Sequence, residues 1–285
     1  KFNDLDKIYN IEFELVIIGT PPSSHLSLFK FCKKNFKYKK IMIEKPLAVF
    51  NQNFNKLPKK DFIFCGYNHS VSPSFLYLLN LIVKNKEKVL FSSIKWKEGW
   101  TGILNAHYWL KDEFSTYLGN IYKGGGAIHE HSHPIHLAVI ILKNLTKNNI
   151  EVINSNLQFK KKTNKMYDCH ARMLLKSNKN KIDVEIDLLE PGSSKEISIY
   201  LPNKLIRWIH NYDKSNDAVI IYKNNKSKVN LFKKKRETEF INEIRALKKV
   251  NNFKKYNQSN LNVKHAATVM KIIKKVTKNE DLRSN

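Results

Sequence analysis

The sequence predicts an α/β protein built from two parts. The first is a partial, doubly wound parallel sheet, and the second is an α+β domain with a large, mostly antiparallel open sheet. Two observations support this prediction. Residues 13–68 alternate apolar strands with a helix and a connection, an order that favours parallel pairing. Residues 150–230 contain strand after strand separated by short polar turns, an order that favours antiparallel pairing.

The parallel part is predicted from short apolar runs. Residues 4–12 fit the end of a polar helix, and 15–19, 41–43 and 62–65 fit buried strands. Ser23 or Ser24 can cap the helix that begins after the first strand. Its apolar residues recur at helical spacing, namely Leu26, Phe29 and Cys32.

The second of these strands ends in Glu44, Lys45 and Pro46. Ligands of open parallel sheets bind just outside the carboxyl ends of the strands. Pro46 has no amide hydrogen for a ladder, and it constrains Lys45 to extended geometry. The sequence therefore predicts a charged pair held at the rim of the sheet.

The second part is predicted to begin with a helix at 72–85, a strand at 89–96 and an aromatic, irregular segment at 98–123. A helix is expected at 134–145, and helices at 237–250 and 263–276 end the chain. Between them, strands are expected at 152–159, 167–175, 182–189, 196–201, 204–210 and 218–222.

Composition narrows the class of protein. The chain has 285 residues, 42% of them hydrophobic, which suffices for a sizeable core. No apolar run approaches 20 residues, so no membrane span is expected. The net charge of +26 is spread along the chain, so we do not expect a specific nucleic-acid partner. Three cysteines far apart indicate buried thiols, a reducing, cytoplasmic setting and no metal ligands.

Four motifs follow one another in a recognisable order. They are 15–25 (LVIIGTPPSSH), Glu44-Lys45-Pro46, Gly66-Tyr67-Asn68 and Gly124-Gly125-Gly126 with a His-rich tail. This order resembles the Gfo/Idh/MocA family of nicotinamide-dependent oxidoreductases, which act mostly on sugars and their derivatives. The resemblance covers nearly the whole chain. It implies a Rossmann-type sheet, NAD or NADP as cofactor, a sugar-type substrate including nucleotide-linked sugars, and a homo-oligomer formed through the antiparallel sheet.

The resemblance also implies site residues. Lys45, Glu130 and His133 would be catalytic, with His133 taking the hydroxyl proton and Lys45 polarising the oxygen or relaying the proton. Glu130 lies three residues before His133 and would share its face if the segment is helical. Trp109 and His136 would contact substrate, although the family more often has Asp at the latter position. The positions expected to border the cofactor are Thr20, Pro21, Pro22, His25, Glu44, Lys45 and Asn68.

The His-rich tail admits another interpretation. His129-Glu130-His131-Ser132-His133 matches H-E-x-x-H, the helical motif of zinc hydrolases, with Glu151 downstream as a third ligand. Pro134 disfavours helix at His133, and three glycines make a poor preceding turn, so this alternative ranks below the oxidoreductase.

The domain boundaries follow from the same assignments. We expect residues 1–70, with a helix at about 261–276 packing back, to form a partial dinucleotide-binding domain. Residues 71–258 would form the substrate and oligomerisation domain. A dinucleotide fold opens with a strand and a G-x-G-x-x-G turn, and residues 1–14 cannot hold that unit. We therefore expect an N-terminally truncated chain, and a non-catalytic sugar-binding or dimerisation remnant is the main alternative function.

Overall fold

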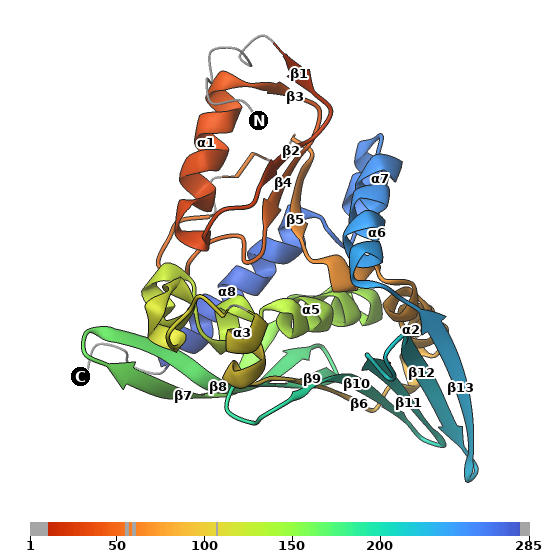
Figure 1. Ribbon diagram of the computed structural model, residues 1–285. Helices are drawn as coiled ribbons and strands as arrows, with labels where there is room; N and C mark the ends of the chain where they lie inside the picture. Colours follow the sequence, from red (N-terminus) through yellow and green to blue (C-terminus); the bar gives the residue numbers. More distant parts are fainter. Residues whose placement is uncertain (1–10, 55–56, 59–60, 107, 280–285) are drawn as a thin grey trace.

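The computed structural model describes residues 11–54, 57–58, 61–106 and 108–279. A small parallel sheet stands at one end of the molecule and an eight-stranded sheet at the other, with helices between them (Figure 1). Of the helices described, none is long and apolar enough to cross a membrane. All three cysteines are free and buried, as predicted.

The small sheet contains β2 (Val16–Ile18), β4 (Ile41–Glu44) and β5 (Ile63–Gly66), which pair in parallel in that order. Helix α1 (His25–Asn35) connects the first two strands. β4 is buried because it is central, whereas β2 is an edge strand whose Ile17 is 50% exposed. The prediction of a buried first strand was therefore wrong for β2, of which only Ile18 is buried.

Two other details of this part differ from the predictions. Residues 4–10 lie outside the described part, and β1 (Glu12–Phe13) pairs with β3 (Lys37–Tyr38). Ser24 stands at the N-cap of α1, but its hydroxyl donates to the carbonyl oxygen of Pro21 and caps no helical amide. The preceding residues form a short 3₁₀ turn, which turns the Ser24 side chain away from the helix.

The large sheet has the strand order β13-β12-β11-β10-β6-β9-β8-β7. Only β6 and β9 pair in parallel, so the prediction of a mostly antiparallel sheet is confirmed. β13 has no predicted counterpart, because its polar, lysine-rich edge sequence lacks the apolar alternation of a half-buried strand. The strands are β6 (Phe91–Glu98), β7 (Glu151–Lys162), β8 (Lys165–Ser177), β9 (Asn180–Asp187), β10 (Ser193–Leu201), β11 (Lys204–His210), β12 (Asn216–Lys223) and β13 (Lys226–Lys233).

Helices α2 (Pro73–Lys84) and α5 (His133–Leu145) pack on one face of the large sheet (Figure 1). The hydroxyl of Ser72 caps α2 by accepting from the amide of Phe75. Trp208 of β11 donates to the hydroxyl of Ser74, which donates to Asp217 of β12, so α2 is tied to two strands.

The last helices return to the small sheet. They are α6 (Arg236–Lys249), α7 (Phe253–Gln258) and α8 (Val263–Asn279), of which α7 was not predicted. The amide of Cys65 in β5 donates to the carbonyl of Leu261, and the Tyr256 hydroxyl donates to the carbonyl of Ile63. The segment expected to be irregular contains α3 (Trp100–Ala106) and three short 3₁₀ turns.

Candidate active site

A cavity of about 850 Å³ contains the best candidate for an active site. Its walls come from the end of β4, from the 3₁₀ helix η3 (Asn68–Val71), from β6 and β10 of the large sheet, and from the segment that joins α4 (Ala127–Glu130) to α5. The side chains that line it include Lys45, Trp96, Trp109, Glu130, His133 and Lys195.

Lys45 and Glu130 form an ion pair in this cavity. The Lys45 ammonium nitrogen lies 2.8 Å from Oε1 of Glu130 and 2.7 Å from its backbone oxygen. Both side chains remain partly open to the cavity, with exposed fractions of 18% and 24%. The hydroxyl of Tyr117 donates to Oε2 of Glu130 at 3.5 Å. A ligand in the cavity can therefore meet an ammonium donor and a carboxylate acceptor at one point.

Glu130 and His133 do not share one helix. Glu130 ends α4, His131 leaves the helical region with ψ 43°, and His133 is the first residue of α5. Pro134 stands in the first turn of α5, where a residue without an amide hydrogen is favourable. Because His131 interrupts the helix, the condition for a shared helical face is not met. The expectation of a non-helical His133 was wrong, because His133 is the first residue of α5. Both side chains nevertheless line the cavity.

The imidazole of His133 lies among aromatic rings. The Trp96 ring stacks on it with centroids 5.8 Å apart, and the His69 ring meets it edge-on at 4.7 Å. Burial, followed by the charges of His69 and Lys45, holds the pKa of His133 well below its usual value. The ring is therefore neutral at pH 7, the form that accepts a proton.

The run Gly124-Gly125-Gly126 holds the segment that contains Glu130 and His133 close to the small sheet. Gly124 has φ +90°, and a Cβ there would lie 2.7 Å from Cβ of Pro22, so the run packs directly on the exit from β2. Gly126 precedes α4, and a Cβ there would collide with the carboxyl of Asp168. Asp168 accepts from the amide of Ile128 at 2.7 Å, and burial raises its pKa to about 8. Asp168 was not predicted, because it lies far away in β8.

The residues predicted to border the cofactor lie at the carboxyl ends of the parallel strands. Glu44 faces Gly66 in the register of β4 and β5, and burial raises the Glu44 pKa. The hydroxyl of Thr20 lies 2.7 Å from that of Ser24, while Oδ1 of Asn68 accepts from the amide of His69. Pro21 is exposed and Pro22 is buried at this edge.

His25 has a different role from the predicted one. Its side chain is fully buried, and its ring nitrogens lie 2.6 Å from the carbonyl oxygen of Thr20 and 2.9 Å from that of Pro46. The ring thus ties the exit of β2 to the end of β4. Burial lowers its pKa, and we assign it to bracing this edge rather than to contact with a cofactor.

The two predicted substrate contacts are placed differently. Trp109 lines the cavity and is 65% exposed at its rim. His136 is buried outside the cavity, stacked on Tyr67 with ring centroids 4.0 Å apart, and its Nε2 lies 3.1 Å from the backbone oxygen of Asn260. We therefore withdraw His136 as a substrate contact and assign it to packing.

The geometry does not support the zinc motif either. Nε2 of His129 accepts from the amide of Phe50 at 3.2 Å, and the His129 ring is fully buried outside the cavity lined by Glu130 and His133. Within the described residues, the group suited to a metal ion is a different one, made of His69, His210 and Glu239.

Several cavity residues had no signal in the sequence. Trp96 and Lys195 come from β6 and β10 and lie directly opposite each other, although they are 99 residues apart in the chain. The Lys195 ammonium lies 4.9 Å from the Trp96 ring centroid and 2.8 Å from Oε2 of Glu98. His69 directly follows the Gly66-Tyr67-Asn68 motif, and this position is the closest that the sequence comes to indicating a role for it.

Comparisons with known proteins show the fold. No protein-family model and no curated protein sequence matches the chain. KijD10, a 3-ketoreductase from Actinomadura kijaniata solved with NADP and TDP-benzene, matches with a TM-score of 0.69 at 12% identity, over 93% of this chain and 78% of that one. A dehydrogenase, MviM, from Clostridium difficile matches with a TM-score of 0.64 at 13% identity, over 98% and 82%.

A third solved structure, UDP-N-acetylglucosamine 3-dehydrogenase GnnA from Acidithiobacillus ferrooxidans, matches with a TM-score of 0.64 at 12% identity, over 96% and 80% of the two chains. At such identities the likeness establishes a shared fold and not a shared activity. The predicted fold class, a parallel sheet joined to a large, mostly antiparallel one, is confirmed.

Proposed function

We propose that the protein is an NAD- or NADP-dependent oxidoreductase of the Gfo/Idh/MocA type. Its reaction would be reversible hydride transfer between the cofactor and a hydroxyl or keto carbon of a sugar or sugar derivative. The observation that carries the proposal is the convergence of Lys45, Glu130 and His133 on one cavity beside the carboxyl ends of a parallel sheet. The named activities of the three structural neighbours are consistent with it.

The residues of the chain fit the proton chemistry of this reaction. A nicotinamide, when bound, supplies the hydride acceptor or donor. Oxidation of an alcohol also requires removal of the hydroxyl proton, and a neutral His133 accepts it. The Lys45 ammonium donates a hydrogen bond to the same oxygen and stabilises negative charge there, while Glu130 positions Lys45. In the reverse direction, the same groups return the proton to the oxygen.

The cavity lining favours a polyhydroxylated substrate. Lys45–Glu130 and Lys195–Glu98 are ion pairs at 2.8 Å, and each presents a donor and an acceptor side by side. A sugar hydroxyl both donates and accepts, so it can bridge such a pair. Trp96 and Trp109 add flat apolar surfaces for the carbon face of a ring.

The edge of the small sheet supplies groups for the cofactor. The carboxyl ends of β2, β4 and β5 lie together there, which is where open parallel sheets bind ligands. The packing of Gly124 on Pro22 brings the segment that contains Glu130 and His133 against this edge. We assign cofactor contacts to the side chains or backbone of Thr20, Pro21, Pro22, Glu44, Lys45 and Asn68.

Two further assignments belong to the proposal. We divide the chain into a dinucleotide-binding part, residues 1–70 with the helix at about 261–276, and a substrate part, 71–258.

We also propose that the face of the large sheet away from α5 pairs two copies of the chain. Cross-strand ion pairs such as Arg172–Asp183 and Arg207–Glu196 lie among the strands of this sheet. Light scattering coupled to size exclusion tests this pairing, and a monomer at all concentrations would contradict it.

The proposed function is tested by following NADH and NADPH absorbance with a panel of keto sugars and nucleotide-linked keto sugars. We expect substrate-dependent oxidation of at least one cofactor in the wild type, and oxidation at least about 100-fold slower in Lys45→Met. Sugar binding by calorimetry without oxidation of either cofactor would instead support the non-catalytic remnant.

A further inference from the structure

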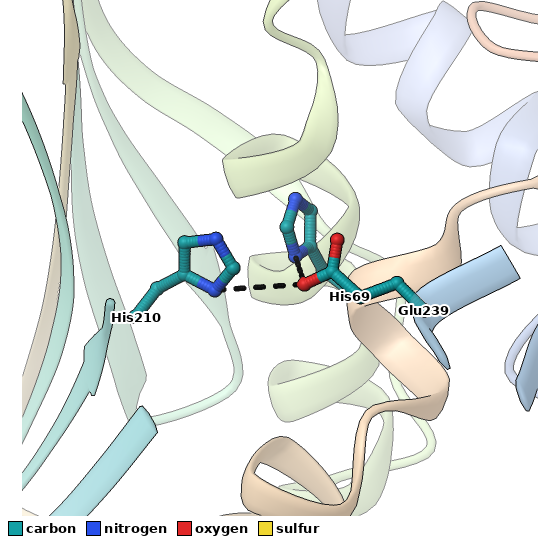
Figure 2. A group of neighbouring side chains, drawn as sticks. All are labelled: His69, His210 and Glu239. Carbon is teal, nitrogen blue, oxygen red and sulfur yellow. Dashed lines mark ion pairs between the residues drawn. The ribbon is translucent and has the colours of Figure 1, made fainter. Parts of the chain in front are cut away.

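A second polar cluster lies on the cavity wall, beside His133. His69 comes from η3, His210 from the end of β11 and Glu239 from α6, and one nitrogen or oxygen atom of each lies within 4.8 Å of the others. Figure 2 shows one oxygen of the Glu239 carboxylate pointing toward a nitrogen of each imidazole. Its Oε1 lies 3.9 Å from Nδ1 of each histidine.

A cation already occupies the centre of this cluster. The Lys234 ammonium lies 2.9 Å from Oε1 of Glu239 and 2.9 Å from Nε2 of His210. Asp217 adds a second carboxylate, with its Oδ1 3.7 Å from the same ammonium. Two carboxylates, those of Glu239 and Asp217, thus face one ammonium. A divalent cation in place of the ammonium would balance the two carboxylates.

Two observations indicate ligation rather than simple ion pairing. Nδ1 of His69 is buried and has no hydrogen-bond partner, although the side chain is only 8% exposed and faces Glu239. Oδ1 of Asp217 lies 3.2 Å from Nδ1 of His210, and the Lys234 ammonium lies 2.9 Å from Nε2 and 3.2 Å from Nδ1 of the same ring. A carboxylate that holds one nitrogen of a histidine, leaving the other for a cation, is the usual support of a metal-bound imidazole.

We propose that His69, His210 and Glu239 bind a divalent transition-metal ion of the zinc type, which displaces the Lys234 ammonium. Two imidazoles and one carboxylate are a common donor set for such ions. Metal–ligand bonds of about 2.0–2.2 Å place ligand atoms closer together than the observed spread, in which the three atoms lie within 4.8 Å of one another, so the side chains must move inward when the ion binds.

The remaining coordination position would face the cavity, because all three ligands line it. A hydroxyl or carboxylate oxygen of a small molecule in the cavity would bind the ion directly at this position. Of the neighbouring lysines, Lys195 is paired with Glu98 and Lys45 with Glu130. The site does not depend on hydride transfer, so its test is separate from that of the proposed function.

The test uses tag-free protein that has been treated with a chelator and dialysed. Co²⁺ is added and the visible absorbance of the bound ion is recorded, Zn²⁺ is then used to displace it, and bound metal is measured by elemental mass spectrometry. The variants are His210→Ala, Glu239→Gln, which keeps the size of the side chain, and Lys234→Met, which removes the competing ammonium. His170→Ala is the matched control, because this histidine pairs with Glu185 on β9, outside the cavity.

The wild type should bind about one equivalent, with absorbance typical of nitrogen and oxygen ligands. His210→Ala and Glu239→Gln should lose it, and His170→Ala should not. Lys234→Met should bind at least about tenfold more tightly, because a like charge has been removed from the site. Failure of both the wild type and Lys234→Met to bind metal would overturn the proposal. Stoichiometric binding that survives in both folded His210→Ala and folded Glu239→Gln would also overturn it.

Discussion

The Lys45 ammonium contacts both the side chain and the backbone oxygen of Glu130, at 2.8 and 2.7 Å, across 85 residues of sequence. One charge thereby joins the end of β4 to the end of α4. Glu130 ends α4, and His133 begins α5 three residues later.

Lys45→Met should lower kcat by about 100-fold or more, because an ammonium donor near the reacting oxygen contributes about that much. The KM for the cofactor should change less. Steady-state kinetics measure both, and circular dichroism checks the fold. Lys39→Met is the control, since Lys39 pairs with Glu14 on the exposed surface. A wild-type kcat in Lys45→Met would remove this lysine from the mechanism.

Gly124→Ala should weaken cofactor binding and reduce stability. Gly124 has a positive φ, and the new Cβ would lie 2.7 Å from Cβ of Pro22. The segment that contains Glu130 and His133 must therefore move away from the edge of the small sheet. Gly192→Ala isolates the backbone effect, because Gly192 also has a positive φ but faces open space. Cofactor titration by fluorescence should separate the two variants. Equal affinities for the cofactor would show that the contact with Pro22 does not matter.

Trp109→Ala should raise the KM for the sugar by about tenfold and leave kcat nearly unchanged, because the ring lies at the rim of the cavity, where the proposed function assigns it to substrate binding and not to the reaction itself. Tyr108→Ala provides a neighbouring aromatic control, since Tyr108 is 88% exposed. A loss of kcat without a change in KM would contradict the assignment of Trp109 to substrate binding.

Asp168 should make stability depend on pH. Burial raises its pKa to about 8, whereas the unfolded carboxyl titrates near its usual value of about 4. Between these values the folded state holds a proton that the unfolded state has lost, so the stabilisation from this group falls as pH rises and is constant above about 8. Asp168→Asn does not titrate. Its free energy of unfolding, relative to the wild type, should therefore rise with pH by up to about 1.4 kcal/mol per unit in that window.

Urea unfolding of the two proteins at several pH values between about 5 and about 8 measures this difference. Asp213→Asn is the control, because Asp213 is exposed in a turn. Its carboxyl accepts hydrogen bonds from the amide of Ser215 and the side chain of Asn216, and these lower its pKa instead of raising it. Parallel stability curves for the wild type and Asp168→Asn would show that Asp168 is ionised in the folded protein.

Local patterns predicted most of the elements and one side of the site. The apolar run before Glu44 and the capped helix after Ser72 are encoded in adjacent residues, and both were predicted within a residue or two. β13 and α7 were missed because their short or lysine-rich sequences carry little apolar periodicity. Pro134 indicated correctly that no single helix runs through Glu130 and His133, and the start of α5 was predicted within one residue.

The far wall of the cavity could not be predicted in the same way. Lys195 reaches it through the pairing of β10 with β6, and Lys234 and Glu239 reach it through the junction of β13 with α6. No spacing in the sequence brings these residues together. His136 shows the opposite error, because it occupies a motif position in the sequence while its ring packs on Tyr67.

Deuterium transfer tests the central claim most directly. The full chain is incubated with NADH or NADPH that carries deuterium at the transferable position, together with the best keto sugar from the panel, and the product is analysed by mass spectrometry. The account predicts one deuterium on the carbon that bore the keto group, and incorporation at least about 100-fold slower with Lys45→Met. A sugar that binds in the cavity but never acquires deuterium from either cofactor would contradict it.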